Sequence, residues 1–233
     1  MSQLTEQQIE SLYKFTRQHF VEYYDLQTEL VDHMANGIEQ QWNEHPTLSF
    51  EQARDREFKK FGVFGFMEVL EERQKAMQKN YGRLVLKHVK EYMRIPKIIG
   101  FALIILLTYM ILKFAPIADE FFTGGIFTAG LLYLTSIIVR RRIIKRQNFE
   151  NGKKWMLREL IFSHGFLGGL FFIPIYILHG RVNDINGMYD VWVIALSFII
   201  CCYYLLFYIM AFEIPRRAEE YLEQTYPEYS ITT

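Results

Sequence analysis

The chain has 233 residues, 51% of them hydrophobic, and its 26 Lys and Arg balance its 26 Asp and Glu. Its two cysteines, Cys201 and Cys202, are adjacent within an apolar run, which excludes a disulfide framework and a metal site with the usual cysteine spacing. The neutral total conceals a division between polar residues 1–97 and the four long apolar runs of residues 98–212, so partners must be inferred from the charge of each segment.

Residues 1–80 are predicted to form a cytosolic helical module. Thr5 and Gln8 have the spacing of a capping box, in which two side chains bond the free backbone N–H groups at a helix start. Ser49 and Gln52 have the same spacing. The two boxes therefore predict where the first and third helices of the module begin.

The helix between these boxes has an apolar side chain at every fourth position, which places them on one face. This stripe consists of Leu26, Leu30, Met34, Ile38 and Trp42. Asp25 is the predicted N-cap of this helix, and replacing Trp42 by alanine should cost roughly 3–5 kcal/mol if its ring is fully buried. Gly62 suits the end of the third helix, because glycine adopts the left-handed conformation without a steric penalty. A further helix is expected from about Gly65 to Ile95, and the sequence leaves open whether it is broken near Gly82.

The second helix also carries a polar cluster of Glu29, Asp32 and His33, in which Glu29 and His33 share a face. Two carboxylates and an imidazole can bind a metal, although three ligands crowded on one turn are a weak signal. The alternative is a structural role, in which these side chains bond a neighbouring helix. We favour the structural role and expect neither a metal nor a cofactor.

The sign of the charge changes between residues 72 and 73. Residues 1–72 hold 6 Lys/Arg and 14 Asp/Glu, a net charge of −8, whereas residues 73–97 hold 8 Lys/Arg and one Glu, a net charge of +7. Nucleic acid would repel the acidic part, so no direct nucleic-acid binding is expected. The basic part includes a juxtamembrane helix over residues 81–97 and is expected to attract anionic lipids. The basic residues assigned to lipid contact are Arg83, Lys87, Lys90, Arg94, Lys97, Arg140, Arg141 and Arg142.

Four apolar runs are long enough to cross a membrane core of ~30 Å as helices. They cover about residues 98–117, 121–139, 160–178 and 191–212, and a cytosolic tail follows over residues 213–233. The predicted fold class is therefore all-α, with an N-terminal cytosolic helical bundle followed by a four-helix transmembrane bundle.

Loops rich and poor in Lys and Arg alternate along this part of the chain. The segment 83–97 has five and the loop 140–158 has eight, whereas the loop 116–120 has none and the loop 179–190 has one. Because positively charged loops stay in the cytosol, both termini are predicted to be cytosolic. The expected location is the bacterial inner membrane.

Two of the predicted spans carry small residues four positions apart. These pairs are Gly125 with Ala129 and Gly165 with Gly169. Small residues let helix backbones approach closely, either within one chain or at the seam of a homodimer. Both alternatives remain open from the sequence.

Short motifs in residues 29–65 resemble those of a known family. Glu29 to Met34 (ELVDHM) resembles the E-x-x-D-H-L helix of the HAAS family of bacterial signalling domains. Leu48 to Ala53 resembles that family's S-x-E-E-A helix start, and Lys59 to Gly62 resembles its L-G-x-P helix end, although Phe64 and Gly65 stand where proline would be. The resemblance covers about residues 5–75. It implies a small cytosolic module followed by membrane spans, an association with PadR-like transcription regulators, and no catalytic residue.

The predicted function is that of a non-enzymatic signalling or regulatory protein, whose module binds a cytosolic or membrane protein partner such as a PadR-like regulator. An accessory or permease-like subunit of a transport complex is the first alternative, and a membrane enzyme is the second. A transporter needs a polar site at the membrane midplane, and an enzyme needs a cluster of acid–base groups. The sequence indicates neither, and it has no H-E-x-x-H, phosphate-loop or G-x-S-x-G motif.

Overall fold

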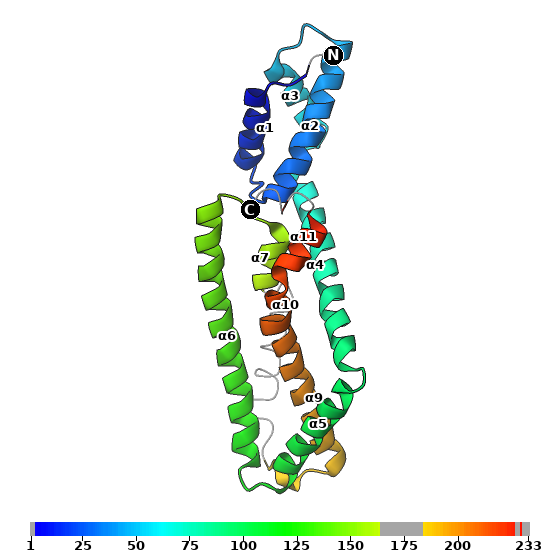
Figure 1. The fold of residues 1–233 in the computed structure, drawn as a ribbon, viewed down its shortest axis with the longest axis vertical. Coiled ribbons are helices and arrows are strands. Elements are labelled where there is room, and N and C mark those ends of the chain that lie inside the picture. Colours follow the sequence, from blue (N-terminus) through cyan, green and yellow to red (C-terminus); the bar gives the residue numbers. More distant parts are fainter. Residues whose placement is uncertain (1–2, 164–183, 227–228, 230–233) are drawn as a thin grey trace. The chain divides into compact units, whose positions relative to one another are not determined.

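The computed structural model describes residues 3–163, 184–226 and 229, and this part of the chain is all-helical without strands. The predicted all-α class is therefore confirmed at that level. The chain divides into two compact units, whose helices are labelled in Figure 1. Unit 1 comprises Met1–Met77 and Asn148–Arg158, and unit 2 comprises Gln78–Gln147 and Glu159–Thr233.

Unit 1 contains α1 (Glu6–Gln18), α2 (Tyr24–Glu44), α3 (Phe50–Lys59) and the first turns of α4 (Phe66–Tyr92). Both predicted capping boxes are present. The Thr5 side chain accepts a hydrogen bond from the backbone N–H of Gln8, and the Ser49 side chain accepts one from that of Gln52. In each box the glutamine side chain bonds back to the cap residue. These local bonds satisfy free N–H groups and set where α1 and α3 begin.

The core of unit 1 combines an aromatic cluster with the apolar stripe of α2. Ring centroids are 5.1 Å apart between Phe15 and Phe58 and 4.9 Å apart between Phe58 and Phe66, where α1, α3 and α4 meet. On α2 the predicted stripe is buried except at its last member. The buried members, at most 3% exposed, are Leu26, Leu30, Met34 and Ile38. Each such side chain contributes ~1.5–3 kcal/mol by leaving water, so α2 is the central element of the unit.

The predicted N-cap of α2 is wrong, and the last residue of its apolar stripe is less buried than the others. The helix begins at Tyr24, so Asp25 is not its N-cap but a buried residue in its first turn. Trp42 is only half-buried, and its indole N–H donates to the carbonyl of Leu48 at 3.1 Å. The period of the stripe predicted the face of Trp42 correctly, but the end of α2 has few neighbours beyond this turn. The C-cap of α3 is Lys60 rather than Gly62, which lies two residues further on in the left-handed region with φ +78°.

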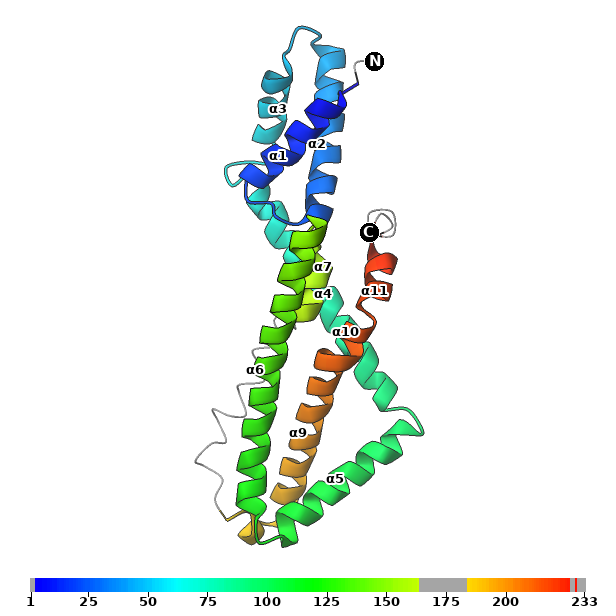
Figure 2. The ribbon, with the colours of Figure 1, turned by 60° about the vertical axis from the view of Figure 1, so that its left-hand side comes forward.

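Unit 2 contains three helical stretches that are long and apolar enough to cross a membrane. They are α5 (Lys97–Phe114), the Ala118–Arg146 part of α6 (Ala118–Asn151), and Asp190–Arg216, which begins with α9 (Asp190–Tyr208). Figure 2 shows α9 between α5 and α6. These helices correspond to the first, second and fourth predicted spans and are those of a membrane protein. The predicted span 160–178 lies outside the described residues, apart from its start in α7 (Met156–Ser163).

α4 is unbroken, and α6 is longer than the sequence indicated. α4 continues through Gly82 without a break, because Tyr81 and Val85 beside it are both buried at 2% exposure and one glycine weakens a helix by only ~1 kcal/mol. α6 continues beyond the predicted span to Asn151, so most of the predicted loop 140–158 is helical. Lys and Arg favour helices, and the charges that mark the end of a span therefore do not end the helix.

The remaining described elements are short. A 3₁₀ turn covers Ile185–Gly187 before α9, and a π turn covers Ile209–Glu213 after it. Next come α10 (Ile214–Arg216) and α11 (Ala218–Thr225). Pro215 has no N–H to donate to the preceding turn, which accounts for the change of helical geometry at this point.

Candidate functional site

The predicted cluster Glu29, Asp32 and His33 is divided among different neighbours. Glu29 Oε2 lies 3.2 Å from the guanidinium of Arg73 on α4. The His33 ring meets the ring of Phe61 edge-on, with centroids 5.5 Å apart, and Asp32 is exposed. Within the described residues, no three His, Cys, Asp or Glu side chains gather as metal ligands. The geometry therefore supports the structural role for Glu29 and His33 and leaves Asp32 on the surface.

A buried carboxylate beside this cluster was missed by the sequence analysis. Glu57 on α3 is 2% exposed, and its Oε2 accepts from Gln41 Nε2 at 2.8 Å and lies 2.6 Å from Lys60 Nζ. His33 Nε2 is 4.0 Å from the other carboxylate oxygen. Gly37 makes room for it, because a Cβ there would lie 2.6 Å from Glu57 Oε2. Buried charges need such partners, so this carboxylate holds α2 and α3 in register.

Unit 1 also includes the segment 152–157, which joins α6 to α7. The Tyr24 N–H donates to the carbonyl of Lys154 at 2.7 Å. The Met156 N–H, at the start of α7, donates to Asp25 Oδ1 at 3.2 Å. Asp25 therefore does serve a helix N-terminus, but that helix lies 131 residues away in sequence rather than at its own position.

Side chains reinforce this docking of segment 152–157 onto α2. Lys154 Nζ lies 2.8 Å from Glu22 Oε2, and the Lys153 ammonium lies 4.5 Å from the centroid of the Tyr24 ring. Trp155 is 3% exposed and packs edge-on against Tyr24, with ring centroids 5.4 Å apart. Two hydrogen bonds, one ion pair and a buried indole together attach the link between α6 and α7 to the start of α2.

A charged hollow of about 570 Å³ lies beside this attachment within unit 1. Its lining includes Glu10 and Arg17 of α1, Tyr24 of α2 and Lys153 of the docked segment. Tyr13 lines it too, and burial raises the pKa of this phenol while its hydrogen bond to a threonine hydroxyl opposes the rise. Because both signs of charge line the hollow, the chemistry there favours no single charge of ligand.

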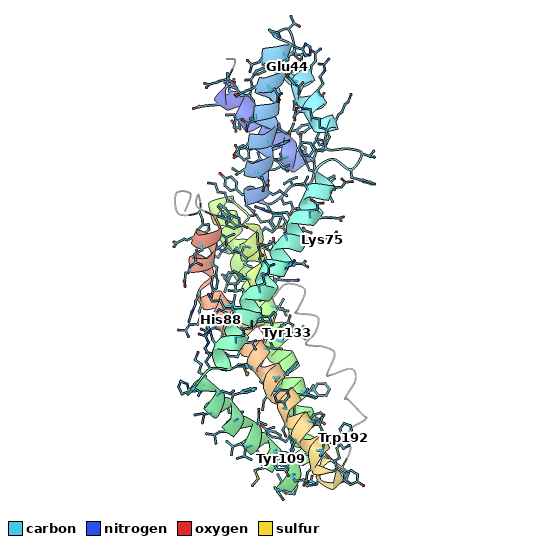
Figure 3. All side chains as sticks on the ribbon, turned by 90° about the vertical axis from the view of Figure 1, so that its right-hand side faces the viewer. Glu44, Lys75, His88, Tyr109, Tyr133 and Trp192 are labelled. Carbon is cyan, nitrogen blue, oxygen red and sulfur yellow. The ribbon has the colours of Figure 1, made fainter. Side chains whose placement is uncertain are left out.

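In unit 2, a polar network ties together the loops at one end of the spans. Lys113 Nζ lies 2.9 Å from Asp190 Oδ1. The Asp119 carboxylate accepts the backbone N–H of Asp184 at 3.0 Å and that of the next residue at 2.9 Å. The Asn186 amide donates to two carbonyls at the end of α5, at 3.2 and 2.9 Å. Tyr109 and Trp192 mark this end in Figure 3.

The basic residues predicted to contact lipids are mostly exposed. The exposed ones are Arg83, Lys87, Lys90, Arg94, Lys97, Arg141 and Arg142. Arg140 differs, because it is half-buried and its guanidinium donates to the carbonyl of Ala211. It therefore bridges α6 to the segment that follows α9, which the sequence did not indicate.

His88 is a second buried polar residue that the sequence analysis missed. It lies on α4 (Figure 3) and is 1% exposed. Its Nε2 is 2.8 Å from the Tyr221 hydroxyl of α11, and its Nδ1 is 3.2 Å from Glu91 Oε2 without hydrogen-bond geometry. Burial raises the pKa of Tyr221, and Arg217 opposes this rise. The pair attaches the tail helix to α4, and only a contact between residues far apart in sequence reveals it.

The small-residue pair of α6 packs within the chain. The Tyr204 hydroxyl of α9 donates to the carbonyl of Gly125 at 2.6 Å, and Ala129 is completely buried. A Cβ on Gly125 would lie 3.5 Å from that hydroxyl. Of the two interpretations of this pair, the structure supports packing of α6 on α9. Gly165 and Gly169 lie outside the described residues.

A largely apolar hollow of about 880 Å³ lies among α5, α6 and α9. Its polar lining includes Thr108 and Tyr204, and both hydroxyls already donate to backbone carbonyls of the spans. A hollow of this size is within the range of ligand pockets, and its lining also includes the charged residues Lys97 and Glu120.

Comparison with known proteins found no match to a family model, a curated protein or a solved structure. Function must therefore be inferred from the geometry described above.

Proposed function

We propose that this chain is a non-enzymatic membrane protein of the bacterial inner membrane, in which unit 1 is a cytosolic module that binds a regulatory protein partner. The observation that carries the proposal is the attachment of segment 152–157 to the start of α2. By chain connection, that segment joins a span helix, α6, to α7. The chain therefore passes between unit 1 and unit 2 at both ends of this segment as well as along α4.

This attachment provides a route by which the membrane part can act on the module. A change in the separation of α6 and α7 would pull on the Tyr24–Lys154 and Asp25–Met156 bonds. Both bonds end in the first turn of α2, whose buried stripe organises unit 1. A displaced α2 would present its outer face differently to a partner. Such a response requires two arrangements of unit 1 that have nearly equal free energy. A small number of hydrogen bonds can then decide which arrangement is populated.

The outer face of α2 is the surface proposed to bind the partner. Asp32, Asn36 and Gln40 recur at intervals of four residues, and all three are exposed. The net charge of −8 over residues 1–72 favours a partner with a basic surface. The resemblance of this helix to HAAS domains leads to a PadR-like regulator as the candidate partner.

The distribution of charge supports an orientation with both termini in the cytosol. Lys97 begins α5, Arg140 bonds Ala211 after α9, and both lie away from the end where Lys113 pairs with Asp190. Basic groups beside the inner leaflet are favoured because that leaflet is anionic. The end with Lys113 and Asp190 would then face the exterior.

A photo-crosslinking amino acid in the full-length chain, expressed in its own cells, tests the proposal. At Asp32 or Asn36 it should give one dominant protein adduct that mass spectrometry can identify. The matched control is Ile117, which is 58% exposed at the end of unit 2 that we assign to the exterior. The same adduct from Ile117, or no adduct from Asp32, Asn36 and Gln40, would refute a partner surface on α2.

The runner-up, an accessory subunit of a transport complex, draws on the 880 Å³ hollow among the spans. A transport path needs polar groups free to bind a substrate, whereas Thr108 and Tyr204 donate to backbone carbonyls. A membrane enzyme would need clustered acid–base groups, and the buried Glu57 is already bonded by Gln41 and Lys60. The regulator is therefore the function that the described geometry supports best.

A further inference from the structure

The turn between α3 and α4 presents two large apolar side chains to solvent. Val63 is 96% exposed and Phe64 is 69% exposed. On the inner side of the same turn, the rings of Phe61 and Phe66 pack edge-on with centroids 4.8 Å apart. In the sequence FGVFGF (residues 61–66), the rings of Phe61 and Phe66 therefore pack against each other, whereas the side chains of Val63 and Phe64 between them are exposed. In Figure 2 this turn projects from the side of unit 1.

Two glycines allow the backbone of this turn to adopt its conformation. Gly62 has φ +78° and Gly65 has φ +54°, both in the left-handed region that glycine adopts most easily. A Cβ on Gly65 would lie 2.8 Å from the Phe58 ring, so the backbone is pressed against the core. Two adjacent, large apolar side chains that are both exposed are a candidate contact surface.

Opposite charges lie on the two sides of this apolar pair. On α3, Arg56 and Lys59 are exposed, and no carboxylate among the described residues forms an ion pair with them. On α4, Glu68 and Glu72 are exposed and equally lack a basic partner in the described part of the chain. The order along the chain is therefore basic, apolar, acidic. A surface with this order is complementary to itself when rotated by half a turn about its apolar centre.

We propose that this elbow, residues 56–72, is the contact between two copies of the chain, related by a two-fold axis through Val63 and Phe64. The basic side of each copy faces the acidic side of the other, and the apolar pairs meet at the axis. The contact is small compared with the area that stable soluble dimers bury. Copies anchored in one membrane in the same orientation have a high effective concentration, which lets a small contact suffice. The inference does not depend on the proposed partner or on the attachment of segment 152–157.

Charge reversal in the full-length chain, reconstituted in lipid vesicles, tests the two-fold arrangement. One variant is Arg56→Glu with Lys59→Glu, and the other is Glu68→Lys with Glu72→Lys. Energy transfer between copies labelled with donor and acceptor dyes reports association. Either variant alone places like charges across the axis, so its dissociation constant should rise by at least about tenfold. When the two variants are mixed, every basic side meets an acidic side, and energy transfer should return to the wild-type value.

Two further variants separate this proposal from its alternatives. Glu44→Lys with Glu51→Lys changes the same amount of charge at exposed positions outside the elbow, and it should leave energy transfer unchanged. Val63→Asp should abolish transfer without changing the helical circular dichroism, because its side chain is almost wholly exposed. No transfer between wild-type copies would overturn the proposal. Failure of the mixed variants to recover, or binding of a different protein at Phe64 with no self-association, would do the same.

Discussion

Replacing Gly37 by alanine should destabilise unit 1, although the same change stabilises most helices. In the interior of a helix, alanine is favoured over glycine by about 1 kcal/mol. Here the new Cβ would lie 2.6 Å from Glu57 Oε2, closer than a real contact allows, so the carboxylate must move. Glu57 is 2% exposed and would then lose its bond from Gln41 at 2.8 Å. A lost bond to a buried charged group costs about 1.5–3 kcal/mol, which leaves a net loss of about 0.5–2 kcal/mol after the gain of about 1 kcal/mol from alanine.

Native-state hydrogen exchange of the full-length chain in detergent measures this loss directly. Amides of α2 and α3 should open more easily in Gly37→Ala by the stated free energy. Gly82→Ala is the matched control, since Gly82 also lies inside a helix but a Cβ there would meet no atom within 4 Å. It should stabilise α4 by about 1 kcal/mol.

A double variant identifies Glu57 as the cause. In a Glu57→Ala background the obstacle is gone, so Gly37→Ala should there become stabilising by about 1 kcal/mol. The change of sign between the two backgrounds is the decisive result. If Gly37→Ala stabilises the otherwise unchanged chain as Gly82→Ala does, the placement of the Glu57 carboxylate against α2 is refuted.

Three further predictions concern the attachment, the orientation and a strained turn. Trp155→Ala should cost about 3–5 kcal/mol, because a fully buried ring is removed, and hydrogen exchange should increase most in the first turns of α2; equal exchange there would contradict the attachment. The orientation is tested in a chain with Cys201 and Cys202 replaced by serine. A cysteine at Tyr189, which is 82% exposed, should react with an impermeant thiol reagent outside intact cells, and a cysteine at Arg142 should not. The reverse labelling would show that the orientation is the opposite one. Phe20 has φ +66° and is 76% exposed. Glycine at this position should relieve about 1–2 kcal/mol of left-handed strain and add about 0.5–1 kcal/mol of chain-entropy cost, so the melting temperature should rise. A lower melting temperature would argue against that backbone conformation.

The candidate site was only partly predictable. The sequence indicated Glu29, Asp32 and His33 as a polar cluster, but tertiary packing sends Glu29 toward Arg73 and His33 toward Phe61. Glu57 could have been suspected, because it lies four positions after the buried Ala53 on the inner face of α3. No pattern within α3 shows which groups satisfy a buried carboxylate, because Gln41 and Gly37 belong to another helix.

What the sequence determined by itself depends on neighbours along the chain. The two capping boxes, the apolar face of α2 and three membrane-spanning helices follow from spacing and hydrophobicity over one helix, and all are present. What only the tertiary structure decided depends on residues far apart. Asp25 has the side chain of a helix cap, yet the N–H that it accepts comes from Met156, and His88 finds its partner in Tyr221. Local patterns specify which groups must be satisfied, whereas only the packed chain specifies which distant group satisfies them.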